Sequence, residues 1–236
     1  MGIRDNVVSL TITEPGEYVF ARNANFPDNI VLEINSAGVT VDGRGVTFAG
    51  IAGKSDLDLK NINLYFDEKK NMPGLPITEC RDIKDSSIVT AGTSTMNIRG
   101  FGIGKLYGNI DTTKITVTCY PLIPIAGQGA GLPAGPCAAS AINEVYGTVS
   151  GGTFTVKGDI VFGVLLNHGR VSGGKFTIKG TNEATGVGLN YGIVSGGKFT
   201  VDANRAFGVF ENHDGTISGG TFIANGKKLK DPFERR

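Results

Sequence analysis

Acidic and basic side chains gather between residues 58 and 85, in a pattern that could support acid–base chemistry or hold a cation. They are Asp58, Lys60, Asp82, Lys84 and Asp85. Lys60 and Lys84 are 24 residues apart, so a chain that repeats at about this interval would bring them side by side. Carboxylates one repeat apart could then share a calcium ion or act as general acids and bases. The same residues also suit a solvated charged face without chemistry.

A second set of polar and aromatic residues recurs in the later part of the chain. It consists of Glu144, His168, Tyr191 and His213. We predict that these side chains form a stripe that could bind sugar rings by stacking and hydrogen bonding, although they could equally be ordinary corner residues. His168 and His213 are two repeats apart, roughly 9 to 10 Å at the spacing of strands. Because zinc ligands lie about 2 Å from the ion, we expect no shared metal site.

The cysteines flank a long stretch without charges. Cys119 and Cys137 stand at its two ends, and a disulfide between them would contribute about 3 kcal/mol in the chain-entropy model. The alternative is two buried free thiols in a reducing compartment. Cys80 is left over in either case.

The uncharged stretch between these cysteines is longer than one repeat requires, so we predict a loop that leaves the body of the fold. Its apolar side chains are Leu122, Ile123, Ile125 and Leu132. A soluble monomer seldom exposes such a surface. We therefore expect the loop to be covered, either by folding onto its own coils or by inserting against a neighbouring subunit, and we hypothesise self-association through it.

One phrase recurs four times and indicates the architecture that must position these residues. It has the form Ser-Gly-Gly-Thr/Lys-Phe, and its serines are Ser150, Ser172, Ser195 and Ser218, at intervals of 22, 23 and 23 residues. A fixed period of this length is typical of a solenoid. The Gly-Gly pairs and β-branched runs disfavour paired helices and favour parallel strands. We expect Phe154, Phe176, Phe199 and Phe222 to stack in the core.

Asparagines should form a second column. Asn143, Asn167, Asn190 and Asn212 recur with the same period. A side-chain amide both donates and accepts, so the four could hydrogen-bond to one another along the solenoid axis at a corner.

The composition of the chain limits the classes of function that it can have. The 236 residues include 36 glycines and carry a net charge of +1, which gives no general attraction to nucleic acid or anionic membranes. No apolar run is long enough to span a membrane, and no signal-peptide pattern follows Met1. We predict one domain over residues 1–236. Its expected parts are a cap (1–34), irregular coils (35–118), an excursion loop (119–141), regular coils (142–225) and a basic tail (226–236).

The start of the chain resembles the pectin-lyase-like superfamily of right-handed parallel β-helices. The resemblance lies in Pro15-Gly16-Glu17-Tyr18-Val19 followed by Val39-Thr40-Val41-Asp42-Gly43. Val41, Leu64, Ile88 and Ile110 then follow at intervals of 23, 24 and 22 residues. This resemblance implies an all-β, single-stranded right-handed β-helix with coils of about 22–24 residues, a fold that carries lyases, hydrolases, viral tailspikes and adhesins.

The sequence departs from the catalytic patterns of that superfamily. The phrase Asn167-His168-Gly169-Arg170 is only superficially similar to the Gly-His-Gly phrase of its hydrolases, and no aspartate pair precedes it. We therefore expect a non-catalytic scaffold, a virion appendage or cell-surface module that binds a glycan or a protein partner. Elongated β-helices in viral spikes commonly form trimers, so we expect a trimer and an extracellular or virion location. The alternative is a polysaccharide lyase or glycoside hydrolase that acts on an acidic polysaccharide. We expect no cofactor for the scaffold, and calcium would be possible for the enzyme.

Overall fold

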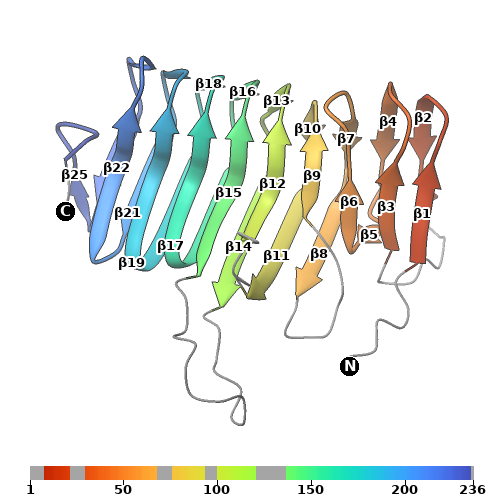
Figure 1. Ribbon diagram of the computed structural model, residues 1–236, viewed down its shortest axis with the longest axis horizontal. Coiled ribbons are helices and arrows are strands. Elements are labelled where there is room, and N and C mark those ends of the chain that lie inside the picture. Colours follow the sequence, from red (N-terminus) through yellow and green to blue (C-terminus); the bar gives the residue numbers. More distant parts are fainter. Residues whose placement is uncertain (1–7, 22–29, 68–75, 94–99, 121–136, 235–236) are drawn as a thin grey trace, which may run out of the picture.

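The computed structural model describes residues 8–21, 30–67, 76–93, 100–120 and 137–234. These residues form a parallel β-solenoid of about eight turns, as the sequence predicts (Figure 1). The described residues contain no helix, and hence none that could cross a membrane. Each regular coil consists of a short strand, a glycine corner and a long strand that bends partway along.

The short strands form a nine-stranded parallel sheet along one side of the solenoid. In order they are β2 (Gly16–Val19), β4 (Val39–Asp42), β7 (Asp58–Lys60), β10 (Ile83–Lys84), β13 (Asn109–Ile110), β16 (Thr148–Val149), β18 (Arg170–Val171), β20 (Ile193–Val194) and β23 (Thr216–Ile217).

The remaining strands form one 16-stranded sheet with two columns. The front column of Figure 1 holds β1 (Val8–Ile12), β3 (Ile30–Ile34), β6 (Gly50–Ala52), β9 (Ile77–Cys80), β12 (Gly100–Leu106), β15 (Ala138–Val145) and β22 (Arg205–Asn212). The other column holds β5 (Thr47–Phe48), β8 (Asn63–Asp67), β11 (Ser87–Thr93), β14 (Lys114–Tyr120), β21 (Lys198–Asp202) and β24 (Thr221–Ala224), with β25 (Lys227–Lys228) after it.

Two long strands join these columns. β17 (Thr153–Asn167) pairs with β14 through its first part and with β15 through its second part. β19 (Lys175–Asn190) pairs with β17 along both parts, with a shift of register between Gly158 and Ile160. The long strand therefore turns a corner of the coil without a loop.

The core is a set of columns, and the phenylalanine column lies as predicted. The rings of Phe154, Phe176, Phe199 and Phe222 stack with centroids 4.4, 4.5 and 4.9 Å apart and planes within 11°. The first three side chains are fully buried, and Phe222 is 6% exposed. Burial and ring stacking therefore both act on this column.

The two glycines of the repeated phrase have different roles. Gly174 has φ +91°, which a side chain rarely tolerates, and its equivalents in the other regular coils share this conformation. Gly173 has no positive φ, but a Cβ there would lie 1.9 Å from the carbonyl oxygen of Ser150 on the preceding coil. The first glycine is thus needed for close packing of coils, and the second for its backbone conformation.

In the irregular coils, the intervals between paired residues differ from those that the sequence predicts. Val41 pairs with Leu59, Leu59 with Ile83, and Ile83 with Ile110, at intervals of 18, 24 and 27 residues. Leu64 and Ile88 pair with each other in the other sheet. The predicted set of Val41, Leu64, Ile88 and Ile110 was wrong, because it combined residues from two sheets.

Both ends of the chain differ from a simple cap and tail. At the start, β1 and β2 pair in parallel with β3 and β4, so residues 8–19 already form a coil. At the end, β25 pairs antiparallel with β24, and the side chain of Leu229 is buried. The amide of Leu229 donates to the carbonyl of Phe222, and the amide of Val209 donates to that of Pro232. The described part of the tail folds back over the last coil.

Candidate functional site

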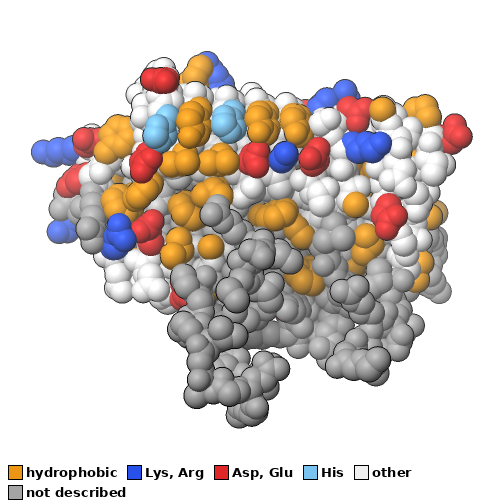
Figure 2. Space-filling model, in the orientation of Figure 1, with side chains coloured by type: hydrophobic (Ala, Val, Ile, Leu, Met, Phe, Trp, Pro, Cys, Tyr) orange, Lys and Arg blue, Asp and Glu red, His pale blue; other side chains and the backbone are white. Residues whose placement is uncertain are grey.

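Five exposed or half-exposed rings stack along one outer corner of the solenoid, and we call them the ring ladder. They are Tyr107, Tyr146, His168, Tyr191 and His213. Neighbouring centroids are 5.0 to 5.2 Å apart and the planes lie within 16° of parallel. Figure 2 shows a row of hydrophobic and histidine side chains near the upper edge of the molecule. The ladder is continuous across five successive coils.

The backbone of this corner explains the spacing of the rings. Each of the first four rings precedes a glycine, as in Tyr146-Gly147 and His168-Gly169. A Cβ on Gly169 would lie 2.1 Å from the carbonyl oxygen of Gly147, and one on Gly147 would lie 2.0 Å from that of Gly108. Because only glycine allows this approach, successive corners sit one strand spacing apart, which is also a stacking distance.

Beneath three of these corners lies the asparagine column. The Nδ2 of Asn167 donates to the Oδ1 of Asn190 at 2.7 Å, and the Nδ2 of Asn190 donates to the Oδ1 of Asn212 at 2.6 Å. Asn167 and Asn190 are fully buried. Asn143 does not join them, because Val145 is the residue that pairs with Asn167. The prediction was correct for three of its four members.

A row of charged and apolar side chains runs beside the ring ladder, and we call it the flanking row. Its members pair in sequence along the front column: Glu79, Lys105, Glu144, Leu166, Leu189 and Glu211. The predicted position of Glu144 within the stripe is therefore corrected to the flanking row. Tyr146 occupies the predicted place instead, and Tyr107 extends the ladder by one coil.

Two glutamates connect the flanking row to the rings. The phenol O–H of Tyr146 donates to the Oε2 of Glu144 at 2.7 Å. The Nε2 of His213 lies 2.8 Å from the Oε2 of Glu211. The hydrogen bond to Glu144, with partial desolvation and the nearby negative charge, raises the pKa of Tyr146 above its ordinary value. Tyr146 is therefore a neutral donor throughout the physiological range.

The stacked geometry limits what the ladder can bind. Inside the ladder both faces of each ring are covered by neighbouring rings, so a sugar cannot stack on them in the predicted way. The ring edges remain open, and Tyr146 and Tyr191 are 43% and 44% exposed. Edges present phenol O–H and imidazole N–H groups, which form hydrogen bonds. The ladder is thus a row of polar edges at a repeat of about 5 Å.

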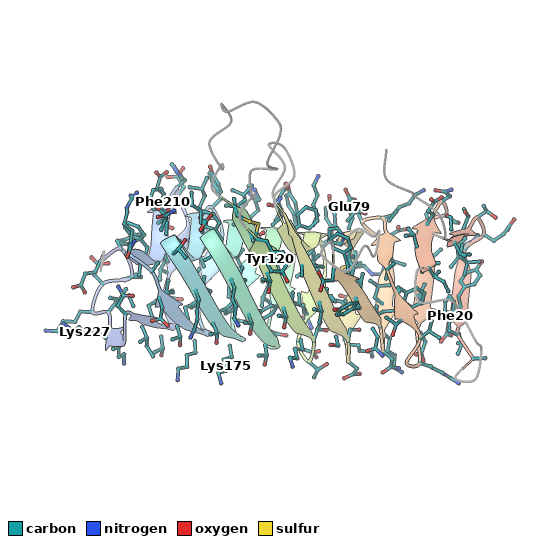
Figure 3. The ribbon with its side chains drawn as sticks, turned by 90° about the horizontal axis from the view of Figure 1, so that it is seen from below. Phe20, Glu79, Tyr120, Lys175, Phe210 and Lys227 are labelled. Carbon is teal, nitrogen blue, oxygen red and sulfur yellow. A yellow bond between two sulfur atoms is a disulfide. The ribbon has the colours of Figure 1, made fainter. Side chains whose placement is uncertain are left out.

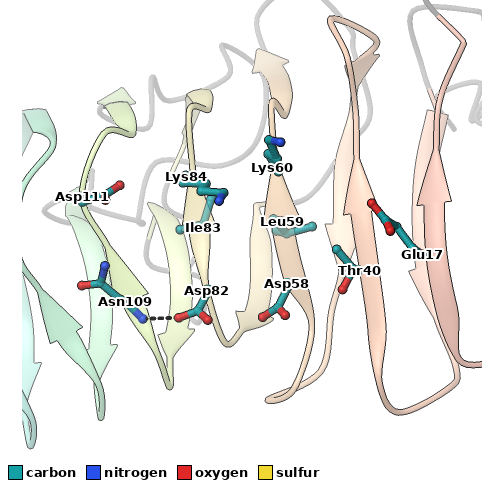
Figure 4. Close-up of a pocket in the computed structure, with 10 residues that line it drawn as sticks. All are labelled: Glu17, Thr40, Asp58, Leu59, Lys60, Asp82, Ile83, Lys84, Asn109 and Asp111. Carbon is teal, nitrogen blue, oxygen red and sulfur yellow. Dashed lines mark hydrogen bonds between the residues drawn. The ribbon is translucent and has the colours of Figure 1, made fainter.

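The acidic and basic cluster lies elsewhere, on the outer face of the nine-stranded sheet. Its members Asp58, Lys60, Asp82 and Lys84 line a shallow hollow of about 520 Å³ together with Glu17, Thr40, Asn109 and Asp111 (Figure 4). Lys60 pairs directly with Lys84, as the sequence predicts. Asp58 and Asp82 precede the paired residues Leu59 and Ile83, so they are neighbours one coil apart.

The carboxylates of this cluster already have partners within the fold. Arg81 binds both oxygens of Asp58, and this carboxylate raises the pKa of Arg81. Asp82 accepts the backbone amide of Asn109 at 2.6 Å (Figure 4), and Asp85 accepts the hydroxyl of Thr112 at 2.9 Å. These aspartates join adjacent coils. Among the described residues, no three histidine, cysteine or acidic side chains are grouped to hold a metal ion.

The structure joins Cys119 and Cys137 in a disulfide, with Cα atoms 5.9 Å apart. The bond ties the end of β14 to the start of β15, so regular strands continue to Tyr120 and resume at Ala138. The predicted assembly residues Leu122, Ile123, Ile125 and Leu132 lie outside the described residues. Cys80 is a buried free thiol, and desolvation together with Asp82 and Asp58 raises its pKa. This thiol is therefore chemically inert in the folded protein.

Comparison with known protein families, with curated protein sequences and with solved structures gives no significant match.

Proposed function

We propose that this protein is a non-catalytic β-solenoid that binds an extended glycan along the ring ladder and the flanking row. The observation that carries the proposal is the uninterrupted ladder of five ring edges, in which Tyr146 contacts Glu144 and His213 contacts Glu211. The resemblance of the first coils to the pectin-lyase-like superfamily remains a prediction.

The chemistry of this surface suits a chain of sugars. Sugar hydroxyls both donate and accept hydrogen bonds, and the ladder offers phenol and imidazole groups while Glu144 and Glu211 offer acceptors. Leu166 and Leu189 lie between the two glutamates and provide contact for the apolar C–H faces of a sugar. The flat, periodic surface matches a linear polymer better than a compact ligand.

Preorganisation supports binding by this surface. An exposed tyrosine normally loses rotamer freedom when it contacts a ligand, which lowers affinity. Here each ring is held by stacked neighbours, so part of that entropy is already lost when the protein folds. A virion appendage or cell-surface module, with trimeric assembly, is the setting that we propose for such a surface.

A glycan array with the intact protein tests the proposal. The variant Tyr146→Ala/Tyr191→Ala should lose the glycan signal by about tenfold or more, the scale of two lost hydrogen-bonding edges. Phe233→Ala is the matched control, because Phe233 is also 43% exposed but lies in the C-terminal tail. Glycan binding that survives the double change would overturn the assignment to the ladder.

The lyase or hydrolase alternative makes a separate prediction. Its sites would be Asp58, Asp82 and Asp85, whose carboxylates the fold uses to join coils. New reducing or unsaturated ends should therefore not appear when acidic and neutral polysaccharides are incubated with the protein, with or without calcium. Product that disappears in the triple aspartate-to-asparagine variant would establish the enzyme instead.

A further inference from the structure

Five lysines project from one flat face of the 16-stranded sheet, away from the ring ladder, and we call this the lysine face. They are Lys114, Lys157, Lys175, Lys179 and Lys198, on β14, β17, β19 and β21. All five side chains are exposed in the structure. Figure 3 shows Lys175 on the opposite side of the molecule from Glu79 and Phe210. This face is distinct from the flanking row, to which Glu79 belongs.

The register places these lysines in two parallel columns. Lys175 pairs with Lys198, and Lys114 is in the same column two coils earlier, separated by Thr153. Lys157 pairs with Lys179 in the second column. The columns are four residues apart along each strand, roughly 13 Å, and the coils repeat at roughly 4.8 Å. The result is a broad, flat, positively charged surface.

Acidic partners are sparse on this face. Within the described ranges none of the five lysines forms a salt bridge, whereas Lys105 on the front column pairs with Glu79 at 3.9 Å. Asp202 is the acidic residue in register with Lys179. Asp159, just beyond Lys157, accepts hydrogen bonds from Thr181 and from the amide of Cys137. Positive charge therefore exceeds negative charge here, although the whole chain has a net charge of only +1.

The fold does not require this concentration of charge. Thr153 and Thr221 occupy the same column as Lys175 and Lys198 and fit the same strand positions. Two lysines on adjacent strands repel each other, so the pairs Lys175–Lys198 and Lys157–Lys179 oppose folding. An anionic ligand would remove that repulsion. This face is thus better explained by a ligand than by the stability of the coil.

We infer that the lysine face binds a linear anionic polysaccharide, one that carries carboxylate or sulfate groups. Between the lysine columns runs a column of threonines: Thr116, Thr155, Thr177 and Thr200. Their hydroxyls can donate to and accept from sugar hydroxyls, while the lysines bind the acidic groups. The site is independent of the ring ladder, and its ligand must carry negative charge.

The same surface is less suited to nucleic acid. Single-stranded nucleic acid is bound by aromatic side chains on which bases stack, and this face carries threonines in their place. Sequence-independent binding of a duplex depends on a large excess of positive charge. A polyuronate or a sulfated glycan requires only the lysines and hydroxyls described above.

Binding of alginate and chondroitin sulfate to the full-length protein tests the inference, with neutral dextran and a DNA duplex as further probes. Replacing both Lys175 and Lys198 by threonine copies the residues that the fold carries at Thr153 and Thr221. The affinity for at least one anionic polysaccharide should fall about tenfold, and its dependence on salt concentration should become shallower. Dextran should not bind this face.

Lys60→Thr/Lys84→Thr is the matched control, because these lysines also pair on adjacent coils but lie among carboxylates. It changes the net charge equally and should leave the affinity within about twofold. Wild-type affinity in the Lys175/Lys198 variant, or an equal loss in the control, overturns the inference. Stronger binding of the DNA duplex than of either polysaccharide also overturns it. The Tyr146→Ala/Tyr191→Ala variant should bind both anionic polymers normally, which separates this site from the ladder.

Discussion

At the scale of single residues, the asparagine column shows how a polar group is accommodated in a solenoid core. Each inner amide donates to the next coil and accepts from the preceding one, as Asn190 does between Asn167 and Asn212. The column begins at Asn167, whose Oδ1 finds no hydrogen-bond donor among the described residues. The reason is that Val145, with an apolar side chain, precedes it in the register.

Replacing Asn190 by Leu should therefore destabilise the protein strongly. It removes both hydrogen bonds between side-chain amides. The Oδ1 of Asn212 then lacks the Asn190 donor, and the Nδ2 of Asn167 lacks the Asn190 acceptor. We expect the free energy of unfolding to fall by about 2 to 4 kcal/mol, measured by urea denaturation. Asn143→Leu is the control, because Asn143 lies outside the column, and it should cost little. Equal effects of the two changes would contradict a role for the column.

At the scale of elements, each coil is stabilised mainly by its contacts with the coils before and after it. Phe176 illustrates this, because its ring stacks on Phe154 at 4.4 Å and on Phe199 at 4.5 Å. Gly174, two residues before Phe176, turns the chain with a positive φ so that the strand of Phe176 starts in register. Interior strands therefore contact neighbours on both sides, and strands at the ends do not.

Phe176→Ala should lower the free energy of unfolding by about 3 to 5 kcal/mol, the range for buried aromatic side chains. Phe222→Ala should cost less, because Phe222 is slightly exposed and stacks on one ring of its column. Chemical denaturation of both variants measures the difference. A smaller loss for Phe176 than for Phe222 would contradict the neighbour-contact account.

At the scale of the whole molecule, a solenoid must protect its last coil. The hairpin of β24 and β25 covers part of the exposed edge, and Leu229 and Pro232 close over the final core residues. A parallel strand without such a cover would present unpaired N–H and C=O groups to other molecules.

Removing residues 226–236 should therefore promote association between molecules. We expect light scattering to show a higher mass that increases with protein concentration, because β24 loses its antiparallel partner. Lys227→Gln/Lys228→Gln keeps the hairpin and removes only its charges, so that variant should behave as the wild type. Association of the charge variant alone would show that repulsion, not the hairpin, prevents aggregation.

The sequence by itself determined the class of fold and the contacts inside the regular coils. A constant interval of 22 or 23 residues identifies equivalent positions, so the phenylalanine column, three of the four asparagines and the Glu183–Arg205 ion pair at 3.1 Å were predictable. Lys60 and Lys84 were also placed correctly.

Only the tertiary structure decided the register where coils differ in length. Val41 pairs with Leu59 at an interval of 18 residues and Ile83 pairs with Ile110 at an interval of 27 residues, which the sequence did not predict. The interval of 39 residues from Ile110 to Val149 could be read from the extra length between Cys119 and Cys137, but the positions of the rings within that coil could not. Tyr107 and Tyr146 are therefore neighbours that no constant period relates, and Glu144 moves from the ladder to the flanking row. The glycines that pack against carbonyls were missed for a similar reason, since the approach of two coils depends on atoms far apart in sequence. In a solenoid, the residues that meet are those at equivalent places in successive coils. A loop added to one coil lengthens the sequence interval between two such residues but leaves their contact in place.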